Sequence, residues 1–326
     1  MPPYAALAAA LVCVATTRAA GAAERAEASE AWKARKSPGA AMALGLLCPG
    51  CGHFYLRDAE SGGAFLGATV ALTVGGFALM LGGDDPPRLG DSTDPSLDAK
   101  DPIGLQLVMA GQNLWFYGAF SAYRDARLLR GDRGARVPLS RETAGDLASA
   151  PFRPSVILRP WVWAGAPLLV GAALGFVYLV DRDSFGDPDR RLTGGRDVNF
   201  LGRRMGTAPG FAAGEAYYAA LFVPVAVGEE ALFRGAVQPA FSQSMGPWSG
   251  WAAASLVFGA VHLVNFVNPE QQDFETAAYA VPFITATGSY LGLASMKTGG
   301  QLATSVAIHF WYDFLLGTAS FLADPD

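Results

Sequence analysis

Five ionisable side chains in apolar stretches of the sequence could together carry out chemistry. Glu229 and Glu230 stand side by side, and Arg234 follows one helical turn later. His262 and His309, two of the chain's three histidines, lie in later apolar stretches of the same kind. Ionisable groups inside membrane-spanning segments are costly and usually functional. Two glutamates and two histidines can activate a water molecule and direct it at a carbonyl carbon, so the pattern indicates a hydrolase within a membrane.

The glutamates and the arginine have a spacing that distinguishes their expected roles. Glu230 and Arg234 are four positions apart and therefore share one face of a helix, which Gln238 extends. We expect Arg234 to neutralise Glu230 and to fix its position. Glu229 lies about 100° further around the helix and is expected to point elsewhere. The alternative is that both glutamates lie at a helix end and face lipid headgroups.

The two histidines each belong to a pair with one-turn spacing. Phe258 precedes His262 by four positions, and Asp313 follows His309 by four positions. His309 and Asp313 could be metal ligands, an oriented imidazole or donors to an oxyanion. A lone histidine in such a segment is often a packing residue. Three pairs with one-turn spacing, on three separate apolar segments, indicate a functional site instead.

The three pairs resemble the motifs of one family of membrane proteases. Residues 229–234 resemble the E-E-x-x-x-R motif of the CPBP (Abi) intramembrane protease family, residues 258–262 its F-x-x-x-H motif, and residues 309–313 its H-x-x-x-N/D motif. The family includes the CAAX prenyl endopeptidases and bacteriocin-processing and immunity proteins. The resemblance covers about the last third of the chain, residues 211–322, and it implies an intramembrane endopeptidase.

The resemblance also implies catalytic roles, which fall on Glu229, Glu230, Arg234, His262, His309 and Asp313. Glu229 is the expected general base, assisted by His262. Glu230 is expected to pair with Arg234 or to help to bind a metal.

The third motif is expected to stabilise the oxyanion through His309 and Asp313. Aspartate stands here where asparagine is commoner in the family, and an ionised aspartate would repel an oxyanion. Asp313 must then be protonated, orient His309 or touch a cation. Zinc is one candidate cofactor, with Glu229, His262 and His309 as its candidate ligands. H-E-x-x-H is absent, and a mechanism without metal is equally compatible with these residues.

The composition indicates an integral membrane protein. The 326 residues are 51% hydrophobic and only 16% charged, with a positive mean hydropathy, which is unusual for a soluble domain. No basic patch with interleaved aromatic residues is present, so nucleic acid is not an expected partner. The expected partners are membrane lipid and a peptide or protein substrate, and the expected location is the bacterial inner membrane. The oligomeric state stays open.

The elements that must position the site are expected to be helices. We predict an all-α, polytopic integral membrane bundle of roughly seven or eight transmembrane helices, judged by the length needed to cross a bilayer. The predicted segments are residues 62–82, 103–122, 161–180, 211–227, 248–267, 276–296 and 302–322, with a shorter run at 40–55.

Three parts are expected along the chain. Residues 1–23 resemble a signal peptide or an N-terminal anchor. Residues 24–150 form an N-terminal membrane module with an acidic loop and a basic connection, which the positive-inside rule places in the cytoplasm. Residues 155–326 form the protease-like module.

A C-P-G-C sequence at residues 48–51 permits two interpretations. It resembles a tight turn in a small two-helix membrane module. The alternative is redox or metal chemistry by Cys48, Cys51 and His53, which offer too few ligands for a closed metal site. The turn is the favoured interpretation.

Two rival functions use the same residues. A transporter or channel could use the carboxylates and histidines as a proton relay, although the sequence has no broken inverted repeat of the transporter type. A catalytically inactive scaffold or immunity protein could retain the motifs without cleaving anything.

Overall fold

The computed structural model describes residues 32, 35–81, 100–132, 135–180, 198–200, 203–267 and 272–323. The predicted signal peptide or anchor and most of the acidic loop lie outside these residues. The predicted helical fold is confirmed in its coarse form, because the described chain is helical apart from one short antiparallel hairpin, β1 (Val198–Phe200) and β2 (Arg203–Met205).

The described residues of the N-terminal part form the helices α2 (Pro38–Leu47), α3 (Cys51–Tyr55), α4 (Ala59–Leu81) and α5 (Lys100–Leu129). Short helices follow, which are α6 (Ala144–Ser149), the 3₁₀ turn Ala150–Phe152, α7 (Pro154–Ile157), α8 (Pro160–Trp163) and α9 (Gly165–Val180). The C-terminal part comprises α10 (Thr207–Leu232), the π-helical turn Phe233–Val237, α11 (Gln238–Met245), α12 (Pro247–Val261), the 3₁₀ turn His262–Asn265, α13 (Phe274–Lys297) and α14 (Leu302–Ala323).

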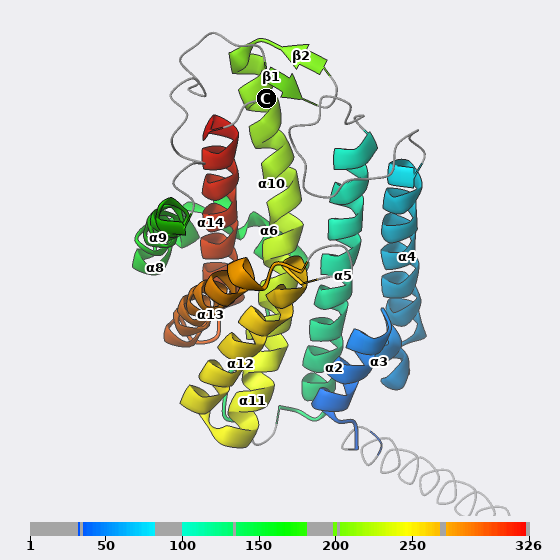
Figure 1. Cartoon of the computed structure of the whole chain (residues 1–326). Coiled ribbons are helices and arrows are strands. Elements are labelled where there is room, and N and C mark those ends of the chain that lie inside the picture. Colours follow the sequence, from blue (N-terminus) through cyan, green and yellow to red (C-terminus); the bar gives the residue numbers. More distant parts are fainter. Residues whose placement is uncertain are drawn as a thin grey trace, which may run out of the picture.

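Long helices form the frame of the molecule. Helix α10 packs between α5 and α14, and α4 packs on α5 (Figure 1). Helices α12 and α13 pair with each other, and both contact the π-helical turn Phe233–Val237 that follows α10. The helices that carry the predicted site residues are therefore neighbours in space.

Two segments of the described chain are long and apolar enough to cross a membrane. They are Ala59–Leu81 and the continuous stretch Thr207–Met245, which includes both glutamates. Pro38–Leu47 and Pro160–Phe176 are apolar but shorter. The number of seven or eight spans therefore stays a prediction.

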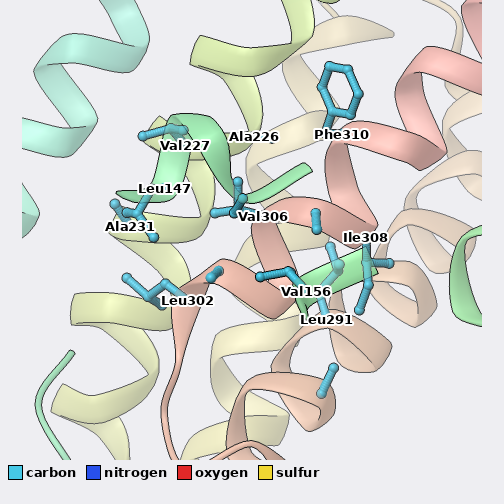
Figure 2. Packing of buried hydrophobic residues seen from close by; sticks show 14 of the residues in the cluster. Leu147, Val156, Ala226, Val227, Ala231, Leu291, Leu302, Val306, Ile308 and Phe310 are labelled. Atoms are coloured by element: carbon cyan, nitrogen blue, oxygen red, sulfur yellow. The ribbon is translucent and has the colours of Figure 1, made fainter. Parts of the chain in front are cut away.

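The core surrounds the first half of α14. Figure 2 shows Leu302, Val306, Ile308 and Phe310 of this helix packed among residues of α10, α13 and the 144–157 segment. Every residue from Leu302 to Phe310 is buried. Apolar burial on all sides fixes the helix in its surroundings, so the side chains at positions 309 and 313 have fixed directions.

Helix α5, from the predicted N-terminal module, packs closely on α10. A Cβ atom added to Gly228 would lie only 2.5 Å from the Asn113 carbonyl oxygen. A Cβ atom added to Gly235 would lie 2.6 Å from the Phe120 ring. Glycine at both positions allows the backbones to approach, so the glutamate-bearing segment rests directly on the N-terminal part.

The C-P-G-C sequence forms a tight turn between α2 and α3. Gly50 has a φ of +80°, and a Cβ there would collide with the Gly62 carbonyl oxygen. His53 is buried and stacks on Phe65 with a centroid distance of 4.9 Å. Packing therefore accounts for Gly50 and His53, as the turn interpretation requires.

Candidate active site

Three separate stretches of the chain supply the predicted site residues. Glu229 and Glu230 lie at the end of α10, and Arg234 lies in the π-helical turn that follows. This turn precedes Pro239, whose missing N–H cannot bond to the carbonyl four residues earlier. Single π-helical turns of this kind often occur at functional sites. Here the turn places Arg234 one turn beyond Glu230, in contact with it.

His262 caps the end of α12, and His309 and Asp313 lie in the middle of α14. The His262 Nδ1 atom lies 2.7 Å from the Phe258 carbonyl oxygen, a hydrogen bond in which only the nitrogen can donate. In a neutral ring the other nitrogen, Nε2, is then an acceptor. The first residue of the F-x-x-x-H motif therefore sets the tautomer of the last.

Glu230 is completely buried and joins two partners. Its Oε1 atom lies 2.9 Å from Arg234 Nη1 and 2.9 Å from His309 Nδ1. Arg234 also donates from Nη2 to the Gly288 carbonyl oxygen at 2.7 Å. A buried carboxylate needs both charge compensation and hydrogen bonds. Glu230 has both, and through them it orients the His309 ring.

Arg234 is enclosed on its other side by an aromatic ring. Its guanidinium carbon lies 4.2 Å from the Phe258 ring centroid, within the range of a cation–π interaction. A Cβ atom added to Gly288 would lie 2.5 Å from the same ring. The close approach of α13 to α12 at this glycine thus holds the arginine against Glu230.

Glu229 differs from Glu230 because the nearest ionisable partners of its carboxylate, among the described residues, lie at 3.9 Å and not at hydrogen-bond distance. Its Oε2 atom is buried and has no hydrogen-bond partner there; the same holds for Oε2 of Glu230, whose carboxylate is held through Oε1 instead. The Glu229 Oε2 atom lies 3.9 Å from Nε2 of His262 and 3.9 Å from Nε2 of His309. Both distances exceed a direct hydrogen bond, and polar groups at such separations are commonly bridged by water.

The structure brings all six predicted residues together in one cluster. His309 is its centre, because Nε2 also lies 3.2 Å from Asp313 Oδ2. As expected from its place on the helix, Glu229 does not share the Arg234 contact of Glu230 among the described residues, and it faces His262 and His309 instead. The two nitrogens of the imidazole lie on different sides of the ring, so His309 faces Glu230 with Nδ1 and Glu229 with Nε2.

Sequence patterns missed two features of this cluster. One is the Glu230–His309 contact, which joins residues 79 positions apart and leaves no local signal. The other is the contribution of α13, whose Gly288 carbonyl binds Arg234 and whose Gly292 carbonyl accepts from the Gln238 amide at 3.2 Å. The glycines in an otherwise apolar segment were the only signal for this contribution.

A metal ion was one predicted cofactor, and the geometry bears on it. In the part of the chain that the structure describes, no three His, Cys, Asp or Glu side chains are grouped as a metal site requires. His309 already has carboxylate oxygens next to both ring nitrogens. Zinc therefore stays a prediction for this site, and the reaction below is derived from the side chains alone.

Comparison with known proteins identifies a family for this region. Residues 213–315 match a family model described as type II CAAX prenyl endopeptidase Rce1-like. No curated protein and no solved structure matches the chain. The matched segment includes all three motifs. The family match and the two long apolar helices together indicate a membrane protein. The family resemblance that the motifs predicted is therefore confirmed for this segment, since residues 213–315 are similar to the Rce1-like type II CAAX prenyl endopeptidases.

Proposed function

We propose that the protein is an intramembrane endopeptidase that hydrolyses peptide bonds with a water molecule activated by Glu229 and His262. The observation that carries this proposal is the buried, unpartnered Oε2 of Glu229, which two imidazole nitrogens face at 3.9 Å. A water molecule bound there would have three polar partners, which is typical of ordered buried water. The family match of residues 213–315 supports protease activity.

In the proposed reaction, Glu229 accepts a proton from the water while His262 Nε2 helps to hold it. The resulting hydroxide attacks the carbonyl carbon of the substrate and gives a tetrahedral intermediate. Protonated Glu229 then gives its proton to the departing amine. General acid–base catalysis of this kind contributes about 10²–10⁴-fold to a rate.

His309 is the proposed stabiliser of the oxyanion. Ionised carboxylates only accept hydrogen bonds, so ionised Glu230 and Asp313 require N–H groups at both ring positions of His309. The ring then carries a positive charge close to the reacting carbonyl, where preorganised charge is most effective. Asp313 thus balances the ring and does not itself face the oxyanion.

The proposed substrate is a peptide or protein segment associated with the membrane. The matching family is named for CAAX prenyl substrates, but whether this chain requires a prenyl group is a question for experiment. The proposed location is the bacterial inner membrane, with the arginine-rich connection on the cytoplasmic side.

Cleavage by the purified protein in lipid nanodiscs tests this function. Membrane-tethered peptides are supplied with and without a farnesyl group, and the products are identified by mass spectrometry. We expect cleavage by the wild type, none by Glu229→Gln, and full activity in the presence of a chelator. Activity that is lost with chelator and restored by zinc would replace the proposed mechanism with a metal-dependent one. Absence of cleavage of any substrate would favour an inactive scaffold.

A further inference from the structure

The segment between α5 and α9 contacts α14 on both sides of His309. We call residues 135–159 the connecting segment. Downstream of His309, Trp311 Nε1 donates to the Pro151 carbonyl oxygen at 2.9 Å. Phe152 packs edge-on against Phe310, with ring centroids 5.2 Å apart. The connecting segment therefore holds the helix just after the histidine.

Glu142 holds the same helix at its start. Its Oε2 atom accepts from the Leu302 backbone N–H at 2.6 Å, and its Oε1 atom accepts from the Ala303 backbone N–H at 3.1 Å. The Ser140 hydroxyl donates to Oε2 at 3.0 Å. The first N–H groups of a helix have no partner within it, and negative charge is favourable there. A carboxylate that is fixed on two successive N–H groups sets both the axial position and the rotation of α14.

Two arginines hold Glu142 and the start of α14 in place. Arg124, on α5, donates from Nη1 to the Glu142 carbonyl oxygen at 3.2 Å. Arg159 donates from Nη1 to Gln301 Oε1 at 2.7 Å and to Thr304 Oγ1 at 2.6 Å. The start of α14 is thereby tied both to the connecting segment and to the N-terminal part.

The position of α14 matters because His309 has several partners at once. It lies seven residues after Leu302, which is about 10 Å along a helix. A slip of one residue would move the imidazole by about 1.5 Å and rotate it by about 100°. The contacts of 2.9 Å to Glu230 and 3.2 Å to Asp313 would not survive such a shift.

We propose that Glu142 is a positioning residue of the active site, which sets the register of α14 and thereby the placement of His309. The proposal rests on the endopeptidase function proposed above. It also gives the N-terminal part a role, because α5 supports the cap through Arg124.

The test compares Glu142→Gln with Asp146→Asn, a matched change in the same segment. The Asp146 carboxylate accepts hydrogen bonds from the Thr143 backbone N–H and hydroxyl, within the cap of its own helix. For Glu142→Gln we expect kcat to fall by about tenfold or more, as misplacement of catalytic groups predicts, with KM nearly unchanged. Amide hydrogen exchange should accelerate at Leu302 and Ala303 and through the turn of His309. Asp146→Asn should leave all these quantities at the wild-type values.

Each outcome decides the proposal. Unchanged kcat, or a rise in KM alone, would overturn it. Should Glu142→Gln not fold, Ser140→Ala removes one hydrogen bond from the carboxylate, and it should show the same changes to a smaller degree. Wild-type kcat and exchange in Ser140→Ala would then overturn the proposal. If the wild type cleaves no substrate, the proposed endopeptidase function fails. The positioning role is tested separately by hydrogen exchange: exchange through residues 302–313 that is as slow in Glu142→Gln as in the wild type would refute it.

Discussion

Glu230 and His309, which lie 79 positions apart in the sequence, meet at 2.9 Å between Oε1 and Nδ1 in the buried centre of the molecule. This contact gives the two adjacent glutamates different roles. Glu230 is bonded to Arg234 and His309 and serves to hold the site. Glu229 has no such direct partner among the described residues, and two imidazole nitrogens face its buried Oε2 at 3.9 Å, so we assign it as the group that accepts the proton.

The first prediction separates these roles by removing the proposed base. Glu229→Gln preserves the shape of the side chain but cannot accept a proton, so cleavage should fall by about 10²–10⁴-fold. Folding should be nearly intact, because this carboxylate makes no hydrogen bond through Oε2 among the described residues. Single-turnover cleavage and the thermal melting of the purified variant measure the two effects. Full activity of Glu229→Gln would refute its assignment as the base.

Removal of Arg234 should affect stability as well as activity. Arg234→Ala leaves Glu230 as a buried carboxylate without its cation and leaves the Gly288 carbonyl oxygen without a donor. Breaking a buried ion pair from one side typically costs about 3–5 kcal/mol. We expect little folded protein and a lower melting temperature in detergent.

Arg234→Lys is the informative companion variant. Lysine restores the charge but lacks the planar fork that reaches both Glu230 and Gly288. Its stability should lie between those of Arg234→Ala and the wild type. Wild-type yield and melting of Arg234→Ala would show that the pair does not support the fold.

The sequence predicted those parts of the site that depend on local spacing. Glu230 with Arg234 and His309 with Asp313 are four apart, and the geometry of a helix brings such pairs into contact wherever the helix lies. The approximate positions of the helices also followed from apolar runs. The expected run at residues 276–296, for example, appears as Phe274–Lys297.

Relationships between helices could not be predicted in this way. Helix geometry separated Glu229 from Arg234, but it could not show that the two glutamates approach different nitrogens of one imidazole, because that depends on where α14 places the His309 ring. The role of Glu142 could not be predicted from the sequence. A single carboxylate in a polar connection can have many partners, and its partner is known only once the start of α14 is placed beside it. The π-helical turn at Phe233–Val237 likewise depends on long-range packing as well as on Pro239.

Asp313→Asn should be tolerated. Asparagine can still accept a hydrogen bond from His309 Nε2 through its side-chain oxygen, and the two atoms lie 3.2 Å apart in the present structure. The family motif also admits asparagine at this position. We expect kcat within about tenfold of the wild type, the range of one lost charge interaction of about 1.4 kcal/mol. A complete loss of cleavage would show that the charge of Asp313 is required, and His309 would then need a different role.

The last prediction concerns Gly288, which touches no substrate in the proposed mechanism. A Cβ atom there would lie 2.5 Å from the Phe258 ring and 3.1 Å from Arg234 Nη2. Gly288→Ala must therefore push Phe258 or Arg234 away, and overpacking of this kind typically costs about 1–3 kcal/mol. Because Phe258 also orients His262 through its carbonyl oxygen, cleavage should decrease together with the melting temperature.

Gly67→Ala is the matched control for this change. Gly67 lies in α4, and a Cβ atom added there meets nothing within 4 Å. Alanine favours a helix over glycine by about 1 kcal/mol, so the control should melt no lower than the wild type and cleave at the same rate. Equal melting temperatures and rates for Gly288→Ala and Gly67→Ala would mean that α13 can retreat from α12. In that case the close packing at Gly288 is not what holds Arg234 against Glu230.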